Sequence, residues 1–110
     1  MKILIDECVP KQIRGFLGNH DSNTVRFAGF SGYKNGNLLN AAEGTYDLLI
    51  TSDKNLRYQQ NLKDRKLAIL LLSTNDREVI EHNGDRILST VNRMKPREFL
   101  ELELPAPKQF

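Results

Sequence analysis

Cysteine and histidine are scarce in this chain. It has a single cysteine, Cys8, and two histidines, His20 and His82, so an internal disulfide is excluded and no Cys/His cluster has zinc-site spacing. Long apolar runs are also missing. The longest strongly apolar stretch, residues 67–72, is far too short to span a bilayer. The first apolar run is broken at once by Asp6 and Glu7, so we expect no signal peptide and a cytoplasmic location.

The charge balance is mildly basic. The chain has 110 residues, of which 27% are charged, with a formal net charge of +2 and a pI near 8.8. Its size predicts one compact domain over residues 1–105, followed by a tail over 106–110. This charge permits a polyanionic partner but does not argue for one, because nucleic-acid-binding proteins usually concentrate their charge in a patch.

Strand-like and helix-like patterns alternate along the chain. Apolar runs predict strands at residues 2–5, 23–27, 47–51 and 67–72, and alternation predicts a half-exposed edge strand at 99–104. Helical spacing predicts helices at residues 10–18, 38–42 and 79–94, the last broken near Asn83 and Gly84, and a short helix or structured loop at 55–62. The alternation indicates a three-layer α/β/α domain with a mostly parallel sheet.

Two of the apolar runs end on carboxylates. Residues 3–5 run into Asp6 and Glu7, and residues 48–50 run into Thr51, Ser52 and Asp53. The carboxyl ends of neighbouring parallel strands open onto one crevice. We therefore expect Asp6 and Asp53 to be metal-binding and catalytic residues for Mg²⁺ or Mn²⁺, with Asp76 or Glu43 completing the ligand set. A carboxylate after a strand often serves only as a helix cap, and for each acid alone that is the stronger interpretation.

Basic residues follow the second acidic strand end. Lys54 and Arg57 come just after Asp53, where they would contact phosphates at the rim of the crevice, and Lys34 is a third candidate for nucleic-acid binding. The wider basic and polar segment consists of Tyr58, Gln59, Gln60, Asn61, Lys63, Arg65 and Lys66. For most of these side chains a solvated surface is the simpler interpretation. Cys8 lies beside the acids, but a cysteine without a placed base is weak evidence for nucleophilic catalysis.

Residues 4–10, Leu-Ile-Asp-Glu-Cys-Val-Pro, resemble the opening motif of short PIN-like proteins, a group of predicted nucleases of toxin–antitoxin systems. Residues 34–39 and 51–56 follow in the expected order, residues 57–62 resemble a segment of one branch, and the similarity extends to about Pro105. The resemblance implies a PIN-like fold and metal-dependent RNA cleavage at Asp6 and Asp53. It implies RNA, a cognate antitoxin protein and a second copy of the chain as partners.

The chain departs from this resemblance at one segment. Similar proteins usually carry an acid near residues 35–37, where this chain has Asn35 and Asn37. Asparagine is neutral and a poorer ligand for Mg²⁺ than a carboxylate. This difference favours an alternative, a catalytically weakened PIN-like module that binds RNA or a protein partner.

A third function is a receiver-like phosphoacceptor domain. Such domains carry an acidic pair after the first strand, an aspartate after the third and a hydroxyl residue after the fourth, and this chain looks similar at all three places. Receivers also place a lysine after the last strand, before a closing helix. Here the chain continues as Leu104-Pro105-Ala106-Pro107 without one.

Overall fold

Five strands and a small set of helices make up the structure, a computed structural model that describes residues 1–58 and 65–106, with Asn35 described by its backbone only. The strands are β1 (Lys2–Ile5), β2 (Asp21–Thr24), β3 (Leu48–Thr51), β4 (Ala68–Leu72) and β5 (Phe99–Leu102). The α-helices are α1 (Asn35–Glu43), α2 (Arg77–His82) and α3 (Gly84–Arg93), and the 3₁₀ helices are η1 (Lys11–Phe16) and η2 (Lys54–Tyr58). None of the helices within these ranges has the length and apolar character that crossing a bilayer requires.

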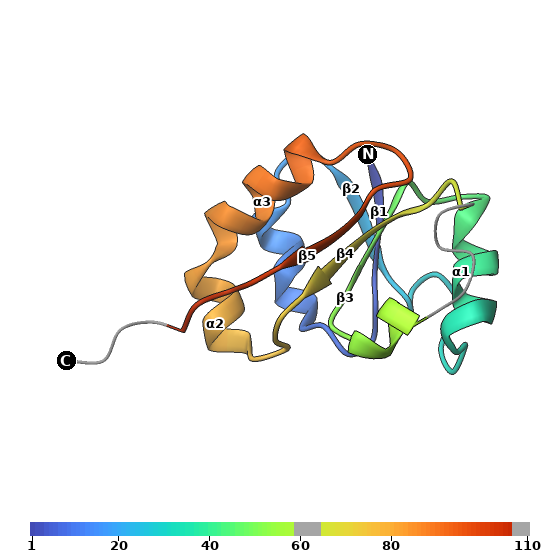
Figure 1. Cartoon of the computed structure of the whole chain (residues 1–110), viewed down its shortest axis with the longest axis horizontal. Coiled ribbons are helices and arrows are strands. Elements are labelled where there is room, and N and C mark those ends of the chain that lie inside the picture. Colours follow the sequence, from blue (N-terminus) through green and yellow to red (C-terminus); the bar gives the residue numbers. More distant parts are fainter. Residues whose placement is uncertain (59–64, 107–110) are drawn as a thin grey trace.

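The strands form one sheet in the order β2-β1-β3-β4-β5, and every neighbouring pair is parallel (Figure 1). The expected α/β class with a mostly parallel sheet is confirmed. β5 lies at the end of this strand order and pairs with β4, so it is the expected edge strand, although it ends at Leu102 and not at residue 104. Helices cover both faces of the sheet, so the central strands are buried on both sides and consist of continuous apolar runs.

Two cores lie on opposite faces of the sheet. In Figure 1, α2, α3 and the blue η1 lie on one side and α1 on the other. Side chains from alternate strand positions, such as Ile5 and Ile50, pack with the first group, while Leu4 and Leu49 pack with Leu38 and Leu39 of α1. Full burial of each such side chain stabilises the fold by about 1.5–3 kcal/mol. The three-layer arrangement therefore follows from strands that are apolar on both faces.

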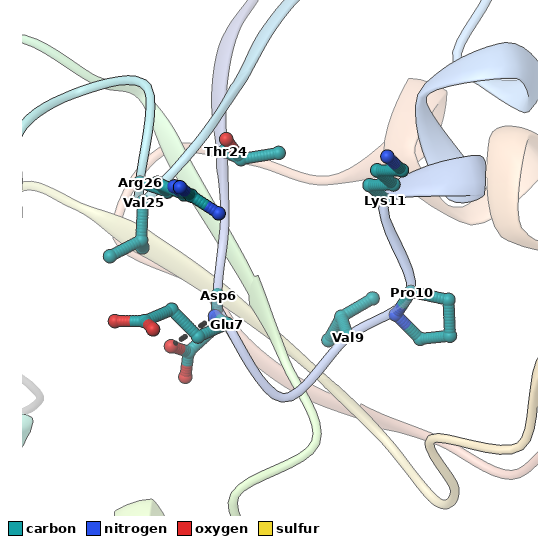
Figure 2. A pocket seen from close by; sticks show the side chains of 8 residues that line it. All are labelled: Asp6, Glu7, Val9, Pro10, Lys11, Thr24, Val25 and Arg26. Atoms are coloured by element: carbon teal, nitrogen blue, oxygen red, sulfur yellow. Dashed lines mark hydrogen bonds between the residues drawn. The ribbon is translucent and has the colours of Figure 1, made fainter. Parts of the chain in front are cut away.

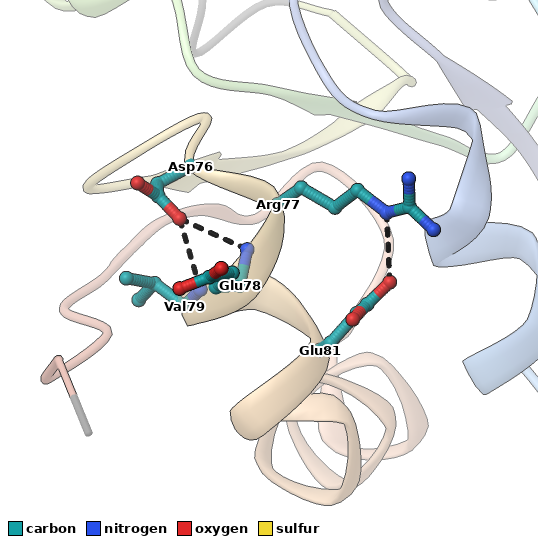
Figure 3. Close-up of polar contacts among 5 residues, drawn as sticks. All are labelled: Asp76, Arg77, Glu78, Val79 and Glu81. Atoms are coloured by element: carbon teal, nitrogen blue, oxygen red, sulfur yellow. Dashed lines mark hydrogen bonds and ion pairs between the residues drawn. The ribbon is translucent and has the colours of Figure 1, made fainter.

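The helix ends match their local sequence. α1 ends before Gly44, as expected, and Asp76 caps α2 by accepting hydrogen bonds from the backbone N–H groups of Glu78 (2.9 Å) and Val79 (3.2 Å) (Figure 3). The predicted break near Asn83 and Gly84 separates α2 from α3. The turn is close-packed, since an added Cβ on Gly84 would lie 3.0 Å from the Phe16 ring.

Some boundaries expected from the sequence were wrong. The second strand is Asp21–Thr24 and not residues 23–27. Residues after Val25 turn instead, with Ala28 N–H donating to the Thr24 carbonyl at 3.0 Å and Phe27 N–H donating to Thr24 Oγ1 at 3.1 Å. The helix expected at 10–18 is a 3₁₀ helix over Lys11–Phe16. Parts of the segments expected at 55–62 and 106–110 lie outside the described residues.

Candidate functional site

The carboxyl ends of β1 and β3 lie side by side in the middle of the sheet. Ile5 pairs with Ile50, and the Asp6 N–H extends the ladder by donating to the Ile50 carbonyl at 3.0 Å. From β1 the chain leads outward to β2, whereas β3 leads to β4 on the other side. This reversal of direction is the topological switch point at which doubly wound sheets bind their ligands.

Thr51 links the acidic ends of the two strands. Its side chain is fully buried at the end of β3, and its hydroxyl donates to Asp6 Oδ2 at 2.7 Å. The Thr51 hydroxyl oxygen also accepts from the Asp53 backbone N–H at 3.1 Å. Cys8 Sγ lies 3.6 Å from both Asp6 Oδ2 and Thr51 Oγ1. One hydroxyl thus orients the Asp6 carboxylate and the backbone that carries Asp53.

Backbone N–H groups donate a hydrogen bond to one carboxylate oxygen in each of three acids, Asp6, Asp53 and Glu7. Asp6 Oδ1 accepts from the Glu7 N–H at 2.8 Å, and Asp53 Oδ1 accepts from the Asn55 N–H at 3.0 Å. Glu7 Oε1 accepts from the N–H of Gly32 at 3.0 Å. Gly32 has a φ of 82°, a conformation that glycine adopts without a Cβ penalty. The carboxylates are therefore fixed in orientation, and each still has lone pairs for a ligand.

These acids line a hollow of about 440 Å³. We call it the Asp6–Asp53 hollow, and its lining residues are Asp6, Glu7, Cys8, Tyr33, Lys34, Leu38, Asp53 and Asn55. It unites Asp6, Asp53 and Lys34, which were singled out from the sequence. Tyr33, Asn55 and the linking role of Thr51 were not predicted. Thr51 could not be found without the strand register, because its partners lie far from each other in the chain.

The carboxylate oxygens of this hollow suit a hydrated hard cation. Within residues 1–58 and 65–106, no three histidine, cysteine, aspartate or glutamate side chains converge closely enough to form a ligand set by themselves. Mg²⁺ usually needs only one or two carboxylates, because it keeps several waters and takes further oxygens from a phosphate. Asp6 and Asp53 are the residues that would hold such an ion, and Glu7 is exposed beside them.

Glu43 and Asp76 lie away from this hollow. Glu43 is the last residue of α1, where Oε1 accepts from the Lys66 N–H at 2.7 Å and Oε2 lies 3.6 Å from Arg65 Nη1. A helix that connects parallel strands runs opposite to them, so the end of α1 reaches the amino edge of the sheet. Asp76 is engaged as the cap of α2. The structure does not bring either acid to Asp6 and Asp53.

The expected phosphate-binding cations are dispersed. The side chain of Arg57 forms an ion pair with Glu101 on β5, and this hydrogen bond raises the pKa of the guanidinium above its ordinary value. Lys54 is exposed at the start of η2, and Lys34 lines the Asp6–Asp53 hollow. The expected contributions of Gln59, Gln60, Asn61 and Lys63 lie outside the described residues. Lys34 is thus the basic candidate that the structure puts beside the acids.

Comparison of the chain with protein-family models, curated proteins and solved structures found no match.

Proposed function

We propose that this protein is a Mg²⁺- or Mn²⁺-dependent ribonuclease of the PIN-like class, acting as the toxin of a toxin–antitoxin pair. The observation that supports it is the meeting of Asp6 and Asp53 at the switch point of a fully parallel sheet, both held by Thr51. The ordered motifs around these residues, in the sequence resemblance, support the choice of RNA and of an antitoxin protein as partner.

Each residue has a defined task in this proposal. Asp6 and Asp53 hold the cation through the carboxylate lone pairs that their hydrogen bonds leave unused, while Thr51 acts as a positioning residue. Lys34 contacts the substrate phosphate as a cationic hydrogen-bond donor at the wall of the hollow. When bound, a divalent cation in such a site stabilises negative charge on the phosphate and lowers the pKa of a bound water.

The test is cleavage of a panel of single-stranded RNAs in Mn²⁺ by the wild-type protein, Asp53→Asn and Asp76→Asn. A bound metal ion supplies several kcal/mol of transition-state charge stabilisation, and each loss of about 1.4 kcal/mol slows the reaction tenfold. We therefore expect Asp53→Asn, which removes a metal ligand, to cleave RNA more slowly by about a hundredfold or more. Asp76→Asn removes a carboxylate outside the hollow and should cleave at the wild-type rate. Equal cleavage by wild type and Asp53→Asn rejects the site assignment.

A second candidate is a PIN-like module that binds RNA or a protein without cleaving it. It is favoured by the lack of a converging three-residue ligand set in the described part of the chain, together with Asn35 and Asn37 where an acid was expected. This module would gain no thermal stability from Mn²⁺, whereas a metal-binding nuclease would. A rise in melting temperature that Asp6→Asn abolishes argues against it.

The receiver-like alternative has less support, although receivers share the strand order seen here. The hydroxyls that follow β4 are engaged in structure: Ser73 Oγ accepts from the Leu104 N–H at 2.9 Å, and Thr74 Oγ1 accepts from the Asp76 N–H at 3.0 Å. The last strand leads into Glu103 and Leu104 without a lysine. Failure of Asp53 to take phosphate from a small-molecule donor removes this alternative.

A further inference from the structure

A second hollow adjoins the acids on the side of β2 (Figure 2). It has a volume of about 340 Å³, and we call it the Lys11–Arg26 hollow. Its lining residues are Asp6, Glu7, Val9, Pro10, Lys11, Thr24, Val25 and Arg26. Asp6 and Glu7 line both hollows, so the two hollows adjoin at these residues, along the carboxyl edges of β2, β1 and β3.

Two cations come to this hollow from different segments. Lys11 is the first residue of η1, and Arg26 lies in the turn after β2. That turn is held by the Gly29 N–H, which donates to the Arg26 carbonyl at 3.2 Å, and by the bonds at Thr24. In Figure 2 the carboxylates of Asp6 and Glu7 point to the side away from Lys11.

Neither cation forms an ion pair with another residue within 1–58 and 65–106. Both side chains are exposed, and in the part of the chain that the structure describes neither Lys11 nor Arg26 has a carboxylate within 4.0 Å. Arg57 and Arg65, in contrast, are tied to Glu101 and Glu43. The side chains of Lys11 and Arg26 are therefore available for an external anion, although the hollow as a whole also carries the carboxylates of Asp6 and Glu7.

We propose that the Lys11–Arg26 hollow binds the phosphate next to the scissile phosphodiester of a single-stranded RNA. This inference rests on the proposed function, because the scissile group lies in the Asp6–Asp53 hollow. A strand that places one phosphate at Asp6 and Asp53 continues across Glu7 into the neighbouring hollow, where arginine and lysine bind backbone phosphates irrespective of base sequence. The two hollows together set the direction and register of the strand.

One exposed aromatic ring in the wall of the Asp6–Asp53 hollow, and a second that follows Arg26 in the chain, favour a single strand over a duplex. Phe27, beside Arg26, has 78% of its surface exposed, and Tyr33, in the wall of the Asp6–Asp53 hollow, has 47%. The Tyr33 ring stacks on Phe30 at a centroid distance of 5.4 Å, which holds it in place. Unpaired bases stack on such rings, whereas the bases of a duplex are already stacked on one another.

The test is binding of a fluorescein-labelled single-stranded RNA octamer, followed by anisotropy in Ca²⁺ at several salt concentrations. Lys11→Gln/Arg26→Gln is compared with Arg86→Gln/Lys95→Gln, which removes the same charge from exposed positions on α3 and at the amino edge of the sheet. We expect the first variant to bind about tenfold more weakly, with a salt slope smaller by about 0.7, the value for one lost phosphate contact. Arg26→Gln alone provides a second, milder variant with a smaller loss.

Equal binding by the two double variants overturns the proposal, as does equal competition by a duplex of the same sequence. Cleavage separates this failure from that of the proposed function. If wild type cleaves RNA and both double variants bind it equally, only the Lys11–Arg26 contact is wrong. If wild type cleaves nothing but only Lys11→Gln/Arg26→Gln loses affinity, the strand contact stands and the nuclease does not.

Discussion

Replacing Thr51 by valine removes the hydroxyl that links the two acidic strand ends and keeps the shape of the side chain. Thr51 is fully buried, donates to Asp6 Oδ2 at 2.7 Å and accepts from the Asp53 N–H at 3.1 Å. The valine methyl group can do neither. Asp6 loses a donor to its charged oxygen, and the Asp53 N–H loses its acceptor.

The expected cost follows from these two bonds. A hydrogen bond to a charged group contributes about 1.5–3 kcal/mol, and a fully buried donor left without an acceptor costs about 1–3 kcal/mol. Both bonds of Thr51 are part-buried, so the lower halves of these ranges apply. The added methyl group returns about 0.8 kcal/mol through apolar burial. We therefore expect Thr51→Val to lower the free energy of unfolding by about 2–4 kcal/mol and, because Thr51 orients Asp6, to weaken Mn²⁺ binding by about 10–100-fold.

Urea unfolding and Mn²⁺ titration measure the two effects. Thr90→Val is the matched control, because Thr90 is 3% exposed and its hydroxyl donates to the uncharged Arg86 carbonyl, at 2.8 Å, within α3. Its unfolding free energy should fall by less than about 1 kcal/mol. Thr51→Ser keeps the hydroxyl and should retain Mn²⁺ affinity. If Thr51→Val is as stable as Thr90→Val and binds Mn²⁺ like wild type, the linking role of Thr51 is refuted.

Three further predictions concern packing, capping and metal. Gly84→Ala should lower the unfolding free energy by about 1–2 kcal/mol, because its Cβ would lie 3.0 Å from Phe16, whereas Gly36→Ala in α1 meets nothing within 4 Å and should be neutral or stabilising. Asp76→Ala should cost about 1 kcal/mol through loss of the cap, without changing Mn²⁺ affinity. Saturating wild type with Mn²⁺ at a hundred times its Kd should raise the melting temperature by about 10 °C.

Each of these has a contrary result. Equal unfolding free energies of Gly84→Ala and Gly36→Ala would show that the Phe16 contact relaxes freely. A loss of Mn²⁺ affinity in Asp76→Ala would place that carboxylate at the metal. A melting temperature that does not respond to Mn²⁺ would leave the non-catalytic module as the better account of the protein.

The sheet and its acidic ends could be predicted because buried parallel strands leave a plain signal. Continuous apolar runs such as residues 3–5, 48–50 and 67–72 indicate burial on both faces, and the polar residues after each run lie at one edge of the sheet. This reasoning places Asp6 and Asp53 together. The all-polar strand Asp21–Thr24 has no such signal, since as an edge strand it needs few apolar side chains.

Other parts of the site depend on information that local patterns lack. Thr51 meets Asp6 through the pairing of β1 with β3, a long-range register. Arg57 pairs with Glu101, which belongs to a strand far along the chain from η2. Because local sequence does not show this pairing, Arg57 was expected to be a phosphate-binding cation. Glu43 was expected to complete the ligand set, but the direction of α1 takes it toward the opposite edge of the sheet.

The most direct test of the central claim is titration of the protein with Mn²⁺, with the free ion measured by electron paramagnetic resonance. The account predicts that wild type and Asp76→Asn bind Mn²⁺ equally, and that Asp6→Asn and Asp53→Asn each lose at least about tenfold in affinity. Absence of binding by wild type at millimolar Mn²⁺, or equal binding by all four proteins, would contradict it.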